Sequence, residues 1–153
     1  MTDLATTYIN FSDGMDLALD GLLLQDDDGL TTAVLLSLFT DKRARVDDVL
    51  PNADQGSTDR RGWVGDDLSE IDGDQLGSLL WLNESAKQLQ SVLTTDRQYA
   101  EDALAWLVTD QIASRVDVVT SNPSMGVRRM DIAIHRPDQP VARFQFDKFW
   151  SNT

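Results

Sequence analysis

Carboxylates are the most numerous groups in this sequence that could do chemistry, with 26 acidic side chains against 13 basic ones among 153 residues. Two segments are dense enough in aspartate to raise the question of a metal site: Asp26-Asp27-Asp28-Gly29 and residues 66–74. Neither has the alternating acids and the closing glutamate of a calcium-binding loop. We therefore expect no metal, and we interpret the first segment as a capped helix start and the second as a solvated loop.

Acid catalysis of glycoside hydrolysis needs one carboxyl group with a raised pKa and an ionised partner across a cleft. Glu70 and Glu84 are the acids that we considered for this role. Only Glu84 follows an apolar segment, Trp81-Leu82, and nothing in the sequence pairs it with a second carboxylate. We expect no catalytic residue and no enzymatic activity, although a cell-wall hydrolase using Glu70 or Glu84 is kept as the alternative function.

The remaining reactive residue types exclude several further classes. The chain has no cysteine, which excludes disulfides, thiolate zinc sites and a cysteine nucleophile. Its single histidine, His135, leaves no histidine cluster for a metal and makes a Ser-His-Asp triad difficult to build. No glycine-rich phosphate loop is present, so we expect no cofactor.

One short segment carries the residue types that anchor protein interfaces. Arg60, Arg61 and Trp63 lie within residues 59–66, beside Gly62 and Gly65. Arginine and tryptophan are enriched in interface hot spots, and arginine forms bidentate pairs with carboxylates. The segment is therefore interpreted either as a partner-binding loop, or as an internal brace in which the arginines pair with the chain's own aspartates and the tryptophan folds onto the core.

The net charge of −13 limits the classes of partner. An acidic surface repels phosphate backbones, so we expect no nucleic-acid partner. The charge serves either solubility alone or contact with a basic protein surface. Residues 1–10 lack the pattern of a signal peptide, and the apolar segment 33–39 is too short to span a bilayer, so we expect a soluble protein with no membrane partner.

Two helices are predicted to position these residues. Leucine and valine recur at helical spacing from Leu30, which predicts a helix that ends near residues 41–45. A second helix is predicted over 95–114, with Thr95 and Gln98 as a capping box. Residues 76–82 are apolar enough for a short third helix. Between the first helix and this segment, residues 47–75 predict a long irregular loop.

The C-terminal third predicts an antiparallel three-stranded meander with strands at 115–120, 127–135 and 141–150, joined by turns at 121–126 and 137–140. In the last strand, Phe144 and Phe146 share one face while Arg143 and Gln145 share the other. The whole chain, residues 1–153, is expected to form one α+β domain with the helices packed on a small, mostly antiparallel sheet.

Several linked segments together resemble the small baseplate wedge protein of Mu-type phages, which is related to the small wedge proteins of T-even-type tails and of type VI secretion baseplates. The segments that carry the resemblance are 30–44, 47–51, 59–66, 76–82 and 99–107, and they span most of the chain from residue 20 to residue 150. Many relatives carry a Glu-Pro-Arg triplet where the long helix meets the meander. This chain has Ala113-Ser114-Arg115 there, which retains only the arginine.

The resemblance implies a structural subunit of a contractile phage-tail baseplate, located in the virion and in the host cytoplasm during assembly. It implies three partners: a larger wedge protein, the tail hub or spike, and a sheath subunit. Separately from the resemblance, the predicted meander, residues 115–150, has edge strands with unpaired backbone groups, and we expect the sheath subunit to add a strand to such an edge. A phage cell-wall hydrolase and a free-standing acidic adaptor are the alternatives. We expect seven residues to contact partners: Arg60, Arg61, Trp63, Arg115, Arg143, Phe144 and Phe146.

Overall fold

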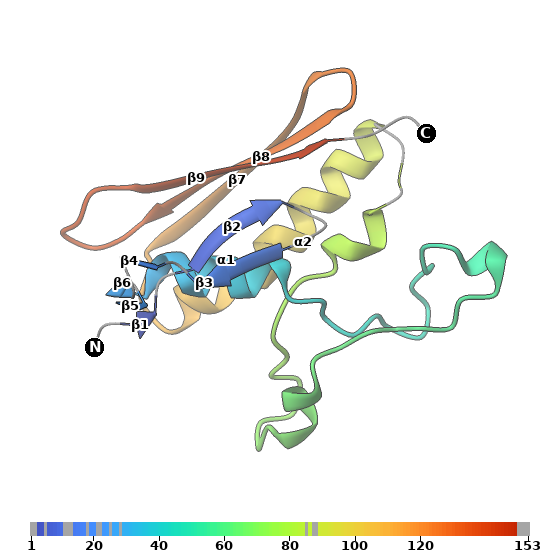
Figure 1. Ribbon diagram of the computed structural model, residues 1–153, viewed down its shortest axis with the longest axis horizontal. Helices are drawn as coiled ribbons and strands as arrows, with labels where there is room; N and C mark the ends of the chain where they lie inside the picture. The colour runs from blue at the N-terminus through green and yellow to red at the C-terminus, as the bar shows by residue number, and fades with distance from the viewer. Residues whose placement is uncertain are drawn as a thin grey trace.

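The computed structural model describes residues 29–84, 86 and 89–149, and before them the backbone of six short strands (Figure 1). Those strands are β1 (Asp3–Leu4), β2 (Thr6–Asn10), β3 (Gly14–Leu17), β4 (Leu19–Asp20), β5 (Leu23–Leu24) and β6 (Asp26–Asp27). They pair antiparallel as β1 with β6, β2 with β3 and β4 with β5. Helix α1 (Leu30–Phe39) contacts β2, β3 and β6, so these strands lie beside it.

Helix α1 is preceded by Gly29, which has φ 85° and, as a glycine, no side chain to cap the first turn. The expected acidic cap from Asp26, Asp27 or Asp28 lies outside the described residues, because only the backbone of Asp26 and Asp27 is described, in β6. The helix stops at Phe39, earlier than predicted, because Thr40 is extended and the chain turns towards Ser78.

Helix α2 (Gln90–Thr109) begins five residues before the predicted capping box. Thr95 therefore lies inside the helix, where its hydroxyl donates to the Ser91 carbonyl at 2.9 Å. This back-bonding satisfies the hydroxyl without a cap. The prediction of a Thr95–Gln98 capping box is wrong.

The C-terminus of α2 also differs from the prediction, which placed it at Ser114. Gln111 adopts a left-handed conformation with φ 61°, and the amide of Ile112 donates back to the Leu107 carbonyl at 2.9 Å. This is the geometry of a Schellman termination, in which the orphan carbonyls of the last turn find donors.

Strands β7 (Arg115–Ser124), β8 (Val127–His135) and β9 (Ala142–Phe149) form the predicted meander, with β8 in the centre. Their inner side chains form cross-strand rows that face the helices: Val118–Ile132–Phe144 and Thr120–Met130–Phe146. The α+β class is confirmed. One turn is misplaced, because Asn122 and Pro123 lie in β7 at a register shift and the chain reverses at Met125-Gly126; Trp150 lies outside the described residues.

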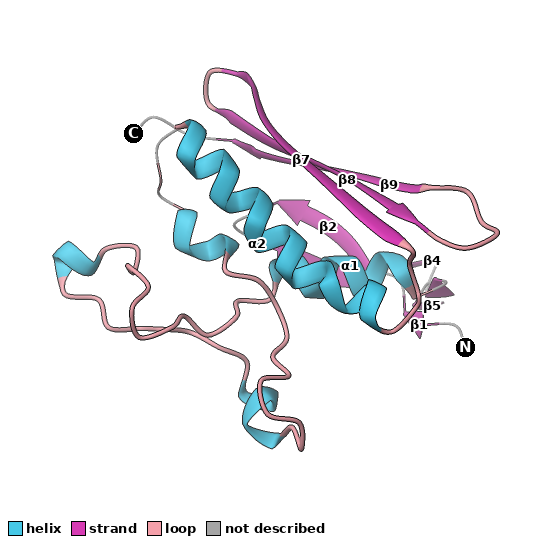
Figure 2. Ribbon diagram, turned by 180° about the vertical axis from the view of Figure 1, so that it is seen from behind, coloured by secondary structure: helices cyan, strands magenta, loops and turns pink. Residues whose placement is uncertain are grey.

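The main core lies between the sheet, α1 and α2 (Figure 2). Helix α2 contributes its apolar stripe and β8 its alternate residues, as the periodicity predicts. The fully buried side chains of this core include Val34, Leu38, Leu104, Leu107, Ile132 and Ile134. We call α1, α2 and β7–β9 the body.

Residues 41–79, here called the loop region, extend away from the body in two lobes (Figures 1 and 2). The first lobe, residues 45–60, carries the 3₁₀ turn η1 (Ala53–Gln55), and the second lobe, residues 62–77, carries η2 (Val64–Leu68). The predicted third helix is reduced to a 3₁₀ turn, η3 (Leu80–Asn83), which joins the loop region to the body.

Five aliphatic side chains on the two lobes are exposed to solvent: Val46, Val49, Val64, Leu68 and Ile71. All of them except Val64 lie beside aspartate or glutamate in the sequence. Among the helices that the structure describes, none is long and apolar enough to cross a membrane.

Candidate partner-binding surfaces

The two lobes of the loop region share one base, where residues 40–44 run between two returning segments. The amide of Ala44 donates to the Arg60 carbonyl at 2.9 Å, and the amide of Lys42 donates to the Ser78 carbonyl at 3.0 Å. The next residue back, Gly77, has φ 106° and lies so close to Thr40 that a Cβ would overlap its carbonyl group. Glycine is therefore required at this crossing.

Arg61 joins this base to η3. Its guanidinium contacts the Asp41 carboxylate at 2.8 Å and the Glu84 carboxylate at 3.6 Å, and it lies 4.5 Å from the centre of the Trp81 ring. Trp81 in turn donates from Nε1 to the Lys42 carbonyl at 2.8 Å. Arg61 thus links acids of the chain itself, which is the arrangement of the internal alternative.

Arg60 closes the first lobe. Its guanidinium donates to the backbone carbonyls of Arg45 and, at 3.0 Å, Val46. Behind it, Ala44, Leu50 and Trp81 form a second, small hydrophobic cluster. Arg60 and Arg61 therefore hold the lobes in place, and their contact with a partner remains a prediction.

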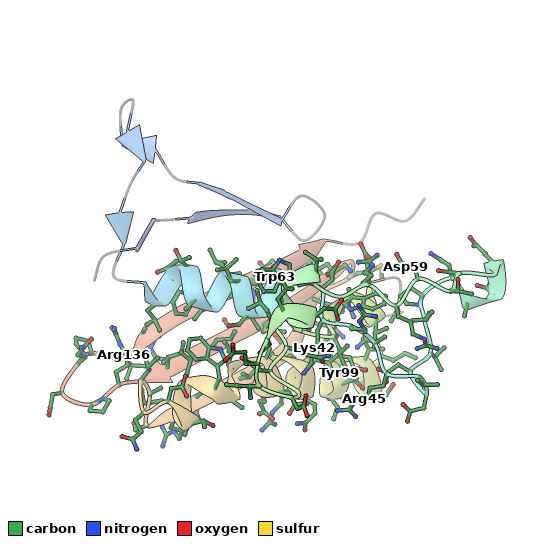
Figure 3. The ribbon with its side chains drawn as sticks, turned by 90° about the horizontal axis from the view of Figure 1, so that it is seen from below. Lys42, Arg45, Asp59, Trp63, Tyr99 and Arg136 are labelled. Carbon is green, nitrogen blue, oxygen red and sulfur yellow. The ribbon has the colours of Figure 1, made fainter. Side chains whose placement is uncertain are left out.

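Trp63 differs from the two arginines because it turns back towards the body. Its ring is 49% exposed and lies near the C-terminal end of α1, whereas Asp59 lies farther out on the first lobe (Figure 3). It lines a groove of about 520 Å³ between α1, α2 and the second lobe, which is here called the tryptophan groove. The three side chains thus lie in different places: Arg60 at the first lobe, Arg61 at the loop base and Trp63 at the tryptophan groove.

Arg115 and Arg143 lie on the outer face of the sheet, away from the helices. Arg115 contacts Asp117 at 3.1 Å and His135 at 3.0 Å, and His135 lies 2.9 Å from Asp117. Hydrogen bonding from His135, together with the charge of Arg115, lowers the pKa of the Asp117 carboxyl group. Arg143 lines the same open face from β9.

Phe144 and Phe146 lie on the opposite, inner face. Phe146 is 5% exposed and packs edge-to-face on Phe39 with 5.1 Å between ring centres. Phe144 stacks beside it at 6.3 Å and is partly buried against the core. These rings therefore fix β9 on the body from within, and Phe146 presents almost no surface to a partner in this structure.

A buried polar cluster that we did not predict joins α2, the sheet and η3. Asp96 and Arg128 form an ion pair at 3.1 Å with side chains 10% and 6% exposed. Asn83 donates to the Asp96 carboxylate at 2.8 Å and accepts from Arg128 through its carbonyl, also at 2.8 Å. Burial raises the pKa of Asp96 despite the charge of Arg128, so desolvation outweighs the pairing.

Lys148 extends this cluster to the end of η3, where its ammonium group donates to the Glu84 carbonyl at 2.6 Å. Burial, followed by the charge of Arg128, lowers the pKa of Lys148 to about 8. A signal for the cluster was present in the sequence. Asp96 lies on the buried, apolar face of α2. Arg128 lies on the inward face of β8, two residues before Met130.

The acids considered for catalysis do not form a site among the described residues. Glu70 is exposed on the second lobe, and Glu84 contacts Arg61. Nor does that part of the chain hold three histidine, aspartate or glutamate side chains placed to bind a metal ion. The described residues present exposed surfaces on the lobes, in the tryptophan groove and on the outer face of the sheet.

Comparisons with known proteins show which family the chain belongs to. The family model described as "Phage protein GP46" matches residues 30–141. The chain is 40% identical to the Mu-like prophage FluMu protein gp46 of Haemophilus influenzae, over 99% of both chains. It is 41% identical to the baseplate protein gp46 of Escherichia phage Mu, over 95% of both chains. The chain therefore belongs to the GP46 family of phage proteins, whose members include the baseplate protein of phage Mu.

Proposed function

We propose that this chain is a structural subunit of the baseplate in the contractile tail of a virion, and that it acts by binding neighbouring subunits. The observation that carries the proposal is its 41% identity, over 95% of both chains, to a protein named as the phage Mu baseplate protein. In finer detail, we propose that it binds a larger wedge protein around the hub or spike and receives a strand of the sheath. Assembly takes place in the host cytoplasm.

The outer edge of β9 supports strand addition. Strand β9 pairs with β8 and lies at one edge of the three-stranded sheet, so no third strand of this sheet lies on its outer side. An edge of this kind accepts an added strand through backbone hydrogen bonds, and alternate side chains set its register. Arg143 and Gln145 project from the outer face of β9, while Phe146 anchors the strand from within.

The loop region supports contact with the larger wedge protein. Its two lobes carry exposed aliphatic side chains and a large excess of carboxylates. The internal ties made by Arg60 and Arg61 hold these lobes away from the body, where a neighbour can reach them. An acidic surface with exposed aliphatic residues is complementary to a basic surface with an apolar centre.

Proline substitutions at the start of β9 test strand addition. Neighbouring residues in a strand direct their N–H groups to opposite sides. One of the variants Ala142→Pro and Arg143→Pro therefore removes a donor from the free edge, and the other removes one from the ladder with β8. Circular dichroism identifies the variant that keeps the wild-type fold. We expect that variant to fail in complementing a phage that lacks this gene, with baseplates but no sheathed tails in electron micrographs.

Full complementation by the variant that keeps the wild-type fold would contradict strand addition at this edge. A peptidoglycan turbidity assay with the purified wild-type protein addresses the hydrolase alternative, and we expect no clearing. Clearing that is lost in Glu84→Gln or Glu70→Gln would favour the hydrolase instead.

A further inference from the structure

We infer that the tryptophan groove is the site where the chain captures a segment of the larger wedge protein, one that carries an apolar side chain next to lysine or arginine. The inference deepens the proposed function and rests on it for the identity of the partner. It moves the contact from the exposed tips of the lobes to the hollow between the second lobe and the two helices.

The floor of the groove is apolar and open to solvent. Leu36 from α1, Trp106 from α2 and Trp63 from the second lobe are 38%, 37% and 49% exposed. Trp106 is held in place by a hydrogen bond from its Nε1 to the Ser37 hydroxyl at 3.0 Å. Large aromatic side chains that are already fixed lose little entropy on binding, which is why tryptophan so often anchors a partner.

Gly65 fixes the position of Trp63 on the other side. A Cβ built on Gly65 would overlap the Trp63 ring, so the ring lies directly against the backbone of η2. The backbone at Gly65 is not left-handed, so an alanine there would conflict only with the Trp63 ring and would displace it. The sequence Trp63-Val64-Gly65 thus places an aromatic side chain over the groove.

The rim of the groove is acidic. Asp66, Asp74 and Asp102 line it, against a single basic residue, Lys42. Asp66 accepts the Leu76 amide through Oδ1 at 3.0 Å, whereas its Oδ2 is buried and has no hydrogen-bond partner among the described residues. Because that oxygen is shielded from solvent, the exposed carboxylates of Asp74 and Asp102 are the ones that a lysine or arginine of the occupant would meet.

These features select the occupant. A second copy of this chain also carries a net charge of −13, so its approach to an acidic rim is opposed. A free anion is opposed by the same carboxylates. A basic segment with an apolar side chain would pack that side chain on the apolar floor and pair its charge with the acidic rim.

Overlapping 15-residue peptides that cover the larger wedge protein of the same phage are the probe, with binding to the full-length chain followed by tryptophan fluorescence. We expect the bound peptides to share an apolar residue next to lysine or arginine. Trp63→Ala is expected to weaken binding by about 10-fold or more, a loss typical of hot-spot residues, and Asp74→Asn, at the exposed rim, by about 3-fold. Gly65→Ala is expected to act in the same direction by displacing the ring, and Leu68→Ala, on the same lobe but outside the groove, is the matched control.

Any one of five results would overturn the inference. Peptide binding that is equal in wild type and Trp63→Ala excludes the groove, and selection of acidic peptides excludes its rim. A concentration-dependent dimer in sedimentation experiments that Trp63→Ala abolishes would assign the groove to a second copy. Capture of the intact larger wedge protein equally by wild type and Trp63→Ala overturns the groove but leaves the proposed function standing, whereas no capture by wild type overturns both.

Discussion

The body and the loop region are stabilised in different ways. The body buries a contiguous apolar core between one sheet and two helices, and its backbone groups are paired within regular elements. The loop region has one small cluster, Ala44, Leu50 and Trp81, and otherwise depends on single interactions such as the Arg61–Asp41 pair. Burial of many apolar groups is cooperative, whereas isolated exposed pairs contribute little. The body should therefore unfold as a unit, and the loop region should open locally.

Core truncations give the largest expected effect. Leu104→Ala removes a fully buried side chain from the body and is expected to lower the free energy of unfolding by about 3–4 kcal/mol. Leu50→Ala removes a buried side chain from the small cluster. It is expected to lower the free energy of local opening by about 2 kcal/mol and to speed proteolysis inside residues 45–60. Calorimetry combined with limited proteolysis separates the two outcomes. An equal drop in Tm for both variants would show that the regions unfold together.

The buried ion pair between α2 and β8, inside the body and next to η3, comes next. Asp96→Ala leaves Arg128 buried without its carboxylate and is expected to cost about 3 kcal/mol in chemical denaturation. The double variant Asp96→Leu/Arg128→Met removes both charges and is expected to recover most of that loss. A loss below about 1 kcal/mol in the single variant would mean that water reaches the pair in solution.

Lys148 predicts a smaller effect that depends on pH. Its pKa of about 8 in the folded chain lies below the ordinary value of 10.5, so between these values the unfolded chain binds the proton more tightly. The free energy of unfolding should therefore rise with pH across this interval, by about 1–2 kcal/mol once partial solvent screening is allowed for. Lys148→Met should lack this rise, and parallel pH profiles of the two proteins would contradict the assignment.

Arg61→Met is expected to have the smallest effect of the series, about 1 kcal/mol, because the ion pair is half exposed and the ring contact is modest. Its signature is local: amide exchange should quicken at Ala44 and Lys42 while β8 stays protected. Arg61→Lys tests whether the planar guanidinium matters. Uniformly faster exchange across β8 would show that Arg61 supports the body as well.

The sequence predicted the body well because its periodicity reports directly on burial. The alternation of Met130, Ile132 and Ile134 and the apolar stripe of α2 identified the inner faces. Element ends were less predictable because they depend on backbone conformation: α1 stops where Thr40 is extended, and α2 stops before the left-handed Gln111. The shortened ends of both helices are errors of this kind.

The candidate surfaces were predicted only in part. Leu36 and Trp106 lie off the apolar stripes of their helices, and no local pattern indicates that the two face one groove with Trp63. The internal roles of Arg60 and Arg61 depend on which segments meet at the loop base, which is a tertiary property. By contrast, the inward phase of Arg128 was visible in the sequence and would have indicated a buried partner.

The exposed aliphatic residues of the lobes have a consequence for the chain before it joins an assembly. Val46 and Val49 flank two aspartates in the sequence, and Ile71 lies between Glu70 and Asp72. Carboxylates that flank adhesive side chains act as gatekeepers, because like charges keep dilute copies dispersed. High salt should weaken this electrostatic repulsion between copies. A basic surface on a partner neutralises the same carboxylates only where that partner docks. The same residues therefore keep free copies apart and allow contact in the assembly.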